Sequence, residues 1–295
     1  MIQLWIILTL TAAFIWAISS LFDKFILSHE LKDPLLATAI SGIIATPIFL
    51  IPALLLKSPI LISFNLILIT FFAGVFAAIA FYFYLMAVKR AEISRVISFL
   101  SITPIFVIFF AFVFLGERLT SLNYFGIVLL VFGSFLISVK KNHDSEYQIS
   151  KAFFIILLSS LFYALRDVII KFTYLSISVW SAMFWLGLGI CFVSVFMFIK
   201  HHPHLRKKAV KGVKHLIFIR IISSFSLLIF LIAISLGPVS LVSALVKLQI
   251  LLVFAGTLIL SRFHPHILKE KITVSILIQK AMAIIAILAG AFLII

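Results

Sequence analysis

The chain contains little acid, cysteine or glycine. Of its 295 residues, nine are Asp or Glu, one is Cys and eleven are Gly. The lone Cys191 excludes an intrachain disulfide and argues against a metal site built on thiolates. The few acids do not form the paired carboxylates that a membrane enzyme would need, and HExxH, GxSxG and glycine-rich phosphate-binding motifs are absent. We therefore expect neither an enzyme nor a primary pump, and neither a cofactor nor a metal.

Apolar residues dominate instead. The chain is 64% hydrophobic and 11% charged, whereas soluble domains are about half apolar and about a quarter charged. The net charge of +15 comes from Lys and Arg in short loops between apolar runs, where anionic lipid headgroups account for it better than nucleic acid does. We predict an all-α integral membrane protein that has the lipid bilayer, and no nucleic acid, as a partner.

Apolar runs of about 20 residues, the length that crosses the hydrocarbon core, occur ten times. Breakers or charges separate most of them, and no soluble domain fits between them. The predicted spans are 3–22, 35–56, 65–88, 95–115, 121–139, 151–170, 179–199, 215–236, 239–260 and 274–295.

The ten spans divide into two similar halves. A shift of 147 residues places "FIWAISSLFDKF" (14–25) on "LFYALRDVIIKF" (161–172) and aligns Lys24 with Lys171. A shift of 146 places "AVKRAEISRV" (87–96) on "AISLGPVSLV" (233–242). Each half has five spans, so the halves should lie inverted in the membrane, with a binding site between them near the midplane. We predict repeats at 1–141 and 150–295.

The ninth predicted span carries a lysine among apolar residues. Lys247 shares a helix face with Ser240 and Ser243, and the fourth span repeats this stripe with Ser98 and Ser101. A charge inside the bilayer is costly and usually faces a protein interior or a watery cavity, so we predict that Lys247 lines a substrate cavity. There are two alternatives: Lys247 forms an ion pair with Asp23 or Asp167, or its side chain extends along the helix so that the ammonium reaches water. Serines also serve helix packing in membranes.

Polar stripes in other spans supply the remaining candidates. The first and sixth spans are in register, and both carry charged, hydroxyl and aromatic residues near their ends. Adjacent opposite charges such as Arg166 and Asp167 either line a cavity or form a structural ion pair. The aromatic residues are alternatively explained by helix packing or by the membrane interface. The predicted substrate-binding residues are Lys247, Ser243, Ser101, Ser98, Trp16, Ser20, Tyr82, Tyr163, Arg166 and Asp167.

The run "AVKRAEISRVISFLSITPIFVIFFAFVFLGERLTSLNYFGIVLLVFGSFLI" (87–137) resembles the fourth and fifth helices of an EamA-type transporter of the drug/metabolite transporter superfamily. Pro104 and the "GER" that begins at Gly116 carry most of the likeness, and "AISSLFDKFILSHELKDP" (17–34) and "GPVSLVSALVKLQILLVF" (237–254) also resemble the family. The resemblance implies ten helices, two repeats and transport of a small molecule. The second half has Arg262 and Phe263 where the first has Gly116 and Glu117, so we expect Glu117, with Pro104 and Gly116, to be structural or gating residues.

These observations predict a secondary transporter in the cell membrane that moves a small polar or amphipathic metabolite by alternating access around a central cavity. Lys247 would favour a substrate with an anionic group. Coupling of transport to a proton or another cation and assembly into a homodimer are further expectations. The alternative is a non-transporting membrane receptor or assembly partner. Lys and Arg are concentrated in the loops after the odd-numbered spans, which places both termini outside, whereas the family resemblance places them inside.

Overall fold

The computed structural model describes residues 3–138, 146–201, 207–263 and 274–295, and no strand occurs within these ranges. The helices are α1 (Leu4–Phe25), its π-helical continuation η1 (Ile26–Glu30), α2 (Pro34–Leu55), α3 (Phe64–Arg90), α4 (Ile93–Leu100), α5 (Thr103–Leu115), α6 (Ser121–Ser138), α7 (Glu146–Thr173), α8 (Val179–His201), α9 (Lys207–Leu236), α10 (Val239–Leu245), the short 3-10 helix η2 (Val246–Leu248), α11 (Gln249–Phe263) and α12 (Val274–Ile294).

Eight helical segments of the described ranges are long and apolar enough to cross a membrane. Three of them consist of consecutive helices: α1 and η1 form Leu4–Glu30, α4 and α5 form Ile93–Leu115, and α10, η2 and most of α11 form Val239–Ile259. The predicted fifth and tenth spans are helical, but their described apolar parts, Ser121–Ile137 and Ile278–Ile294, are shorter. The predicted all-helical class is therefore confirmed, with eight candidate spans and two shorter apolar helices.

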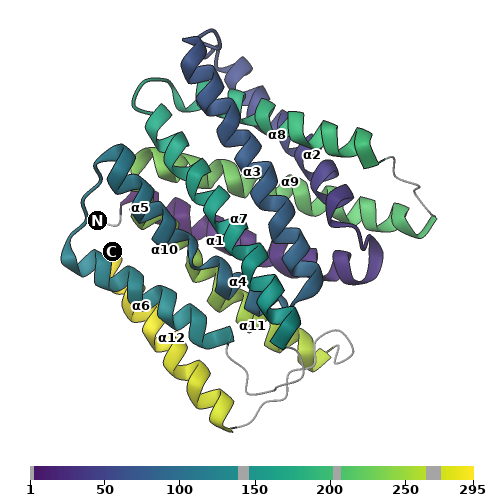
Figure 1. Ribbon diagram of the computed structural model, residues 1–295, viewed down its shortest axis with the longest axis vertical. Coiled ribbons are helices and arrows are strands. Elements are labelled where there is room, and N and C mark those ends of the chain that lie inside the picture. Colours follow the sequence, from purple (N-terminus) through teal and green to yellow (C-terminus); the bar gives the residue numbers. More distant parts are fainter. Residues whose placement is uncertain (1–2, 139–145, 202–206, 264–273) are drawn as a thin grey trace.

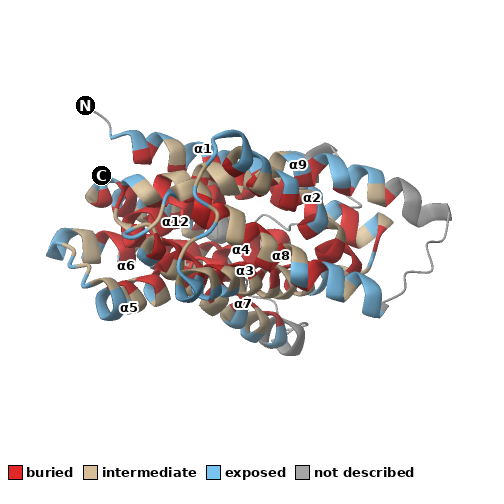
Figure 2. Ribbon diagram, turned by 90° about the horizontal axis from the view of Figure 1, so that it is seen from above, coloured by how far each residue is buried: buried red, intermediate tan, exposed pale blue. Residues whose placement is uncertain are grey.

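Large apolar side chains cover the outside of the bundle. Figure 2 shows exposed positions along the outer faces of the helices and buried positions in the middle. Many exposed positions are phenylalanines; Phe109, in the middle of α5, has 62% of its surface exposed. Such an extensive apolar surface would be an aggregation hazard in water, but lipid chains solvate it.

Small residues let helices from the two parts of the chain approach closely. The main partners are α1 with α9, α2 with α8, α3 with α7 and α8, and α6 with α12, which lie side by side in Figure 1. A Cβ atom added to Gly74 of α3 would lie 2.1 Å from the carbonyl oxygen of Leu186 in α8. One added to Gly189 would lie 2.1 Å from the carbonyl oxygen of Phe71. Only glycine permits this α3–α8 crossing, which is typical of helix packing in membranes.

Two of the predicted spans are interrupted. The fourth breaks at Ser101 and Ile102, between α4 and α5, just before Pro104 in the first turn of α5. Proline has no N–H to donate, so Pro104 cannot bond to the carbonyl of Leu100 four residues earlier, which accounts for this break. The Thr103 hydroxyl donates to that carbonyl instead, at 2.6 Å. The ninth breaks at η2, which contains Lys247 and no proline. The two breaks lie at Ser101 and Lys247, the positions that the 146-residue shift aligns.

A lysine stabilises one helix end in each half. The Lys24 ammonium in α1 donates to the carbonyl oxygens of Val88 and Ala91 at the end of α3, at 2.8 Å each. The Lys171 ammonium in α7 donates to those of Ile234 and Gly237 at the end of α9, at 2.8 and 2.9 Å. The last carbonyls of a helix lack partners within the helix, and a cation there is favourable.

Candidate functional site

A cavity lies in the middle of the bundle, where polar side chains from both halves of the chain converge. The cavity, together with its open mouth, encloses about 1050 Å³. Its polar lining is Ser19, Ser20, Asp23, Thr38, Ser41, Thr103, Arg166, Asp167, Ser194, Arg220, Ser223, Ser224, Lys247 and Gln249, and its aromatic lining is Trp16, Phe81, Tyr84, Tyr163 and Phe230.

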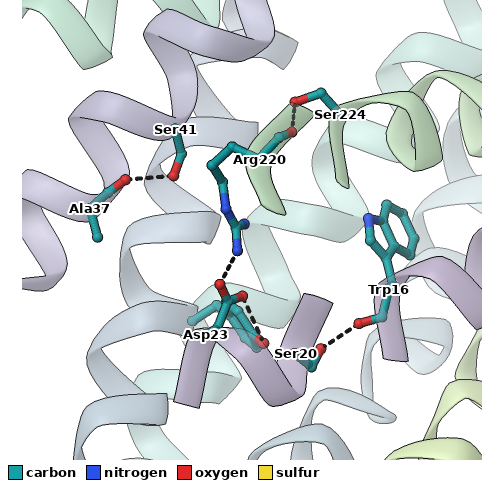
Figure 3. Close-up of polar contacts among 8 residues, drawn as sticks. Trp16, Ser20, Asp23, Ala37, Ser41, Arg220 and Ser224 are labelled. Atoms are coloured by element: carbon teal, nitrogen blue, oxygen red, sulfur yellow. Dashed lines mark hydrogen bonds and ion pairs between the residues drawn. The ribbon is translucent and has the colours of Figure 1, made fainter. Parts of the chain in front are cut away.

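One wall contains a buried ion pair between α1 and α9. The guanidinium of Arg220 donates through Nη2 to Oδ1 of Asp23, and the two side chains point toward one another in Figure 3. Both are almost fully buried, at 4% and 3% exposed. The Tyr84 hydroxyl donates to the other Asp23 oxygen at 3.5 Å, and Arg220 lies over the Phe81 ring, 5.1 Å from its centroid. Both charges are therefore compensated inside the bundle.

A second ion pair lies within α7. Arg166 Nη2 and Nε lie 2.6 and 2.8 Å from Asp167 Oδ1. The guanidinium also lies over two rings, 4.7 Å from the Tyr163 centroid and 5.6 Å from that of Phe230. Phe230 contacts Trp16 at a centroid distance of 5.1 Å. The charge pair therefore adjoins a continuous group of aromatic rings.

Lys247 is the remaining charged residue of the cavity lining. It is 6% exposed, and the nearest charges that act on it are those of Asp167 and Arg166. Asp167 is bonded to Arg166, and Asp23 is bonded to Arg220. Within the part of the chain that the structure describes, the Lys247 ammonium has no hydrogen-bond or ion-pair partner. An uncompensated cation at this depth is costly unless a ligand or water meets it.

Six of the ten predicted binding residues line the cavity. They are Lys247, Trp16, Ser20, Tyr163, Arg166 and Asp167.

Four predicted residues lie outside the cavity lining. The hydroxyls of Ser98 and Ser101 donate to the carbonyl oxygens of Ser94 and Ile97 one turn earlier, at 2.8 and 3.1 Å. Ser243 is buried in α10 and its hydroxyl has no partner among the described residues. Tyr82 contacts the neighbouring Phe83 ring at 5.8 Å. The helical stripe that joins these serines to Lys247 in sequence is interrupted by the breaks in both spans.

The predicted structural residues lie at a helix end and a helix start and are not part of the cavity lining. The Glu117 carboxylate accepts the backbone N–H groups of Val239 and Ser240 at the start of α10, both at 3.1 Å. Gly116 ends α5 with a φ of +64°, a left-handed conformation that favours glycine. Pro104 lies in the first turn of α5. Glu117 thus connects the end of the fourth span to the start of the ninth.

Arg220 and Gln249 line the cavity but are not among the residues predicted from the sequence. Arg220 interrupts the apolar run "LIFIRIISSF" (216–225), the same signal that singled out Lys247, so it could have been found. Gln249 lies two residues after Lys247, which in an unbroken α-helix would place it on another face, yet both line the cavity. The tighter 3-10 turn at η2 changes the angle between successive side chains, which an unbroken α-helix would not do.

Comparisons with known proteins agree with this architecture. The model of the EamA-like transporter family matches residues 3–139. A solved crystal structure has 16% sequence identity and a TM-score of 0.69, and the match covers 98% of this chain and 95% of that chain. At that identity the likeness shows the fold alone. No curated protein matches the chain.

Proposed function

We propose that this chain, which belongs to the EamA-like transporter family over residues 3–139, is a secondary transporter that carries a small polar or amphipathic metabolite through its central cavity by alternating access. The observation that carries the proposal is the cavity itself. Among the described residues, three cations, two carboxylates and several hydroxyls line it, inside a bundle whose outer surface is apolar. Intramembrane charges of this kind mark substrate or ion pathways.

The proposed architecture has ten spans arranged as two inverted repeats, 1–141 and 150–295. Three observations support it. Lys24 and Lys171, aligned by the repeat, bond to the ends of α3 and α9. The fourth and ninth spans break at aligned positions. The helix contacts follow the same symmetry, because α1 contacts α9 as α7 contacts α3, and α6 and α12 contact one another.

We further propose that the termini lie outside the cell membrane. Of the cations that opposed this orientation in the sequence, Arg166 lines the cavity and Lys171 bonds to the end of α9. Neither acts as a loop charge at the membrane surface, so the charge bias that favours this orientation becomes stronger. Protease protection of terminal tags tests it, and tags shielded on the cytoplasmic side would contradict it.

Flux into liposomes tests the transport proposal. A metabolite library is first screened for compounds that raise the melting temperature of the purified chain, because a ligand that binds only the folded state stabilises it. Each stabilising compound is then tested for uptake into liposomes that contain the protein, against empty liposomes. We expect saturable uptake of at least one compound, with a rate that responds to an imposed proton or cation gradient if transport is coupled. Stabilising compounds that never cross the membrane would instead support the non-transporting receptor.

A further inference from the structure

The charges of the cavity wall do not cancel. Among the described residues that line the cavity, Arg166, Arg220 and Lys247 are cations, and Asp23 and Asp167 are anions. Each carboxylate is bonded to an arginine, which leaves Lys247 without a bonded carboxylate and the wall with one more cation than anion. A charge this deep in a membrane protein is normally paired or faces water. One negative charge on a ligand would make the occupied cavity neutral.

The type of anion follows from which donors remain. Phosphate groups carry close to two negative charges at neutral pH and are bound well by the fork of an arginine. Both guanidiniums of this cavity are already engaged by carboxylates, and a doubly charged ligand would leave the occupied cavity negative. A lysine ammonium is a compact donor that suits one carboxylate. A monocarboxylate therefore fits the charges better than a phosphate does.

The apolar part of the ligand would meet a group of rings. Trp16 and Phe230 contact one another at 5.1 Å, and Arg166 joins Phe230 to Tyr163 through its planar guanidinium. All four residues line the same cavity as Lys247. Ring faces and a guanidinium plane favour a flat ligand surface, since stacked and edge-on ring contacts add to area burial.

We propose that the transported substrate is a monocarboxylate with a flat apolar body, its carboxylate bound by Lys247 and its body against Trp16, Tyr163 and Phe230. This substrate class rests on the proposed transport function. The Ser223 hydroxyl, which also lines the cavity, remains available to polar substituents of the substrate.

A matched probe series tests the substrate class on the purified full-length chain at neutral pH. The series is a set of ring monocarboxylates from benzoate to 4-phenylbutyrate, the amide and amine of the same lengths, hexanoate as a carboxylate without a ring, and phenyl phosphate. Thermal unfolding against probe concentration gives an apparent Kd for each. We expect one or more ring carboxylates to bind roughly ten- to hundredfold more tightly than their amides, the range for a hydrogen bond to a charged group. Equal stabilisation by amides or amines, or no stabilisation by any ring carboxylate, would overturn the proposal.

Charge variants then assign the preference to Lys247. Lys247→Met should make carboxylate and amide bind alike, whereas Lys247→Arg should keep the preference. Asp167→Asn raises the net charge of the wall by one and should shift the preference toward phenyl phosphate. The control is Lys200→Met, which removes an exposed lysine at the end of α8 and should change nothing. If Lys247→Met does not fold, Lys247→Arg and Asp167→Asn still decide, and an unchanged preference in Asp167→Asn would refute the charge argument.

Uptake separates this inference from the transport proposal. If a neutral or cationic compound stabilises the chain and enters liposomes, the transporter stands and the monocarboxylate assignment fails. If ring carboxylates bind through Lys247 and none crosses the membrane, the site is assigned correctly and transport fails.

Discussion

The ion pair between Asp23 and Arg220 should be the most strongly coupled charged pair of the bundle. Both side chains are at least 96% buried, so solvent barely reaches the pair. Arg220 Nε has no hydrogen-bond partner among the described residues, and the Tyr84 hydroxyl at 3.5 Å is a long second contact to Asp23. Removing one partner of such a pair leaves a buried charge and typically costs about 3–5 kcal/mol. That is about two to three and a half powers of ten in the unfolding equilibrium.

A double-mutant cycle measures this coupling. Asp23→Asn and Arg220→Met should each reduce the free energy of unfolding by about 3–5 kcal/mol. The double variant should lose less than the sum of the two, by at least about 2 kcal/mol, because neither charge is left alone. Unfolding by SDS in detergent micelles, followed by the fluorescence of the four tryptophans, provides the measurement.

The matched control is the pair between His215 of α9 and Glu30 of η1, the continuation of α1, which has a solvent-exposed histidine. The His215 side chain is 46% exposed, with Nδ1 2.9 Å from Glu30 Oε2. Its coupling should be at most about 1 kcal/mol. If the Asp23 and Arg220 losses add within about 0.5 kcal/mol, or if the two pairs couple equally, the ion pair does not hold α1 against α9 as inferred here.

Two further variants test helix contacts between the halves. Glu117→Ala removes both hydrogen bonds to the start of α10 and should reduce the free energy of unfolding by about 0.5–2 kcal/mol. The control Arg118→Ala, at an exposed neighbouring position, should change it by less than about 0.5 kcal/mol. Equal effects of the two variants would show that the Glu117 cap contributes nothing. Gly74→Ala should reduce the free energy of unfolding by about 1–3 kcal/mol, because its Cβ would meet the backbone of α8. The control Gly256→Ala should reduce it clearly less, because that Cβ would meet only the Leu21 side chain. An unchanged stability in Gly74→Ala would refute the tight crossing of α3 and α8.

The positions of the helices could be predicted from the sequence because a membrane demands long apolar runs. The EamA resemblance carried by the motif around Pro104 and Gly116 is confirmed by the family match over residues 3–139. The interruptions were not predicted. Pro104 is a visible signal for the first, but the second, at Lys247, has no proline or glycine near it in the sequence.

The composition of the cavity wall could be predicted where charge was the signal and not where hydroxyls were. A charged side chain in an apolar run is too costly to expose to lipid, so it faces the protein interior. Lys247 and Arg166 line the cavity for this reason, and the same rule would have identified Arg220. Serine is different because its hydroxyl can bond to a carbonyl of its own helix, as Ser98 and Ser101 do. A serine stripe therefore indicates a cavity only weakly.

The accessibility of the cavity from the two sides of the membrane tests the central claim most directly. The chain has one cysteine, so Cys191→Ser gives a background free of thiols. A cysteine placed at Ser223 in the cavity is then exposed to a membrane-impermeant maleimide, added to right-side-out and to inverted vesicles in turn. Phe109→Cys on the lipid-facing side of α5 is the control and should react from neither side.

Alternating access predicts that the thiol in Ser223→Cys reacts from both sides, and that a transported ligand slows both reactions. Alkylation is irreversible, so even a minor conformation would accumulate label. A thiol that reacts from one side alone, at any length of exposure, would contradict transport through this cavity and would leave it as the binding site of a receptor.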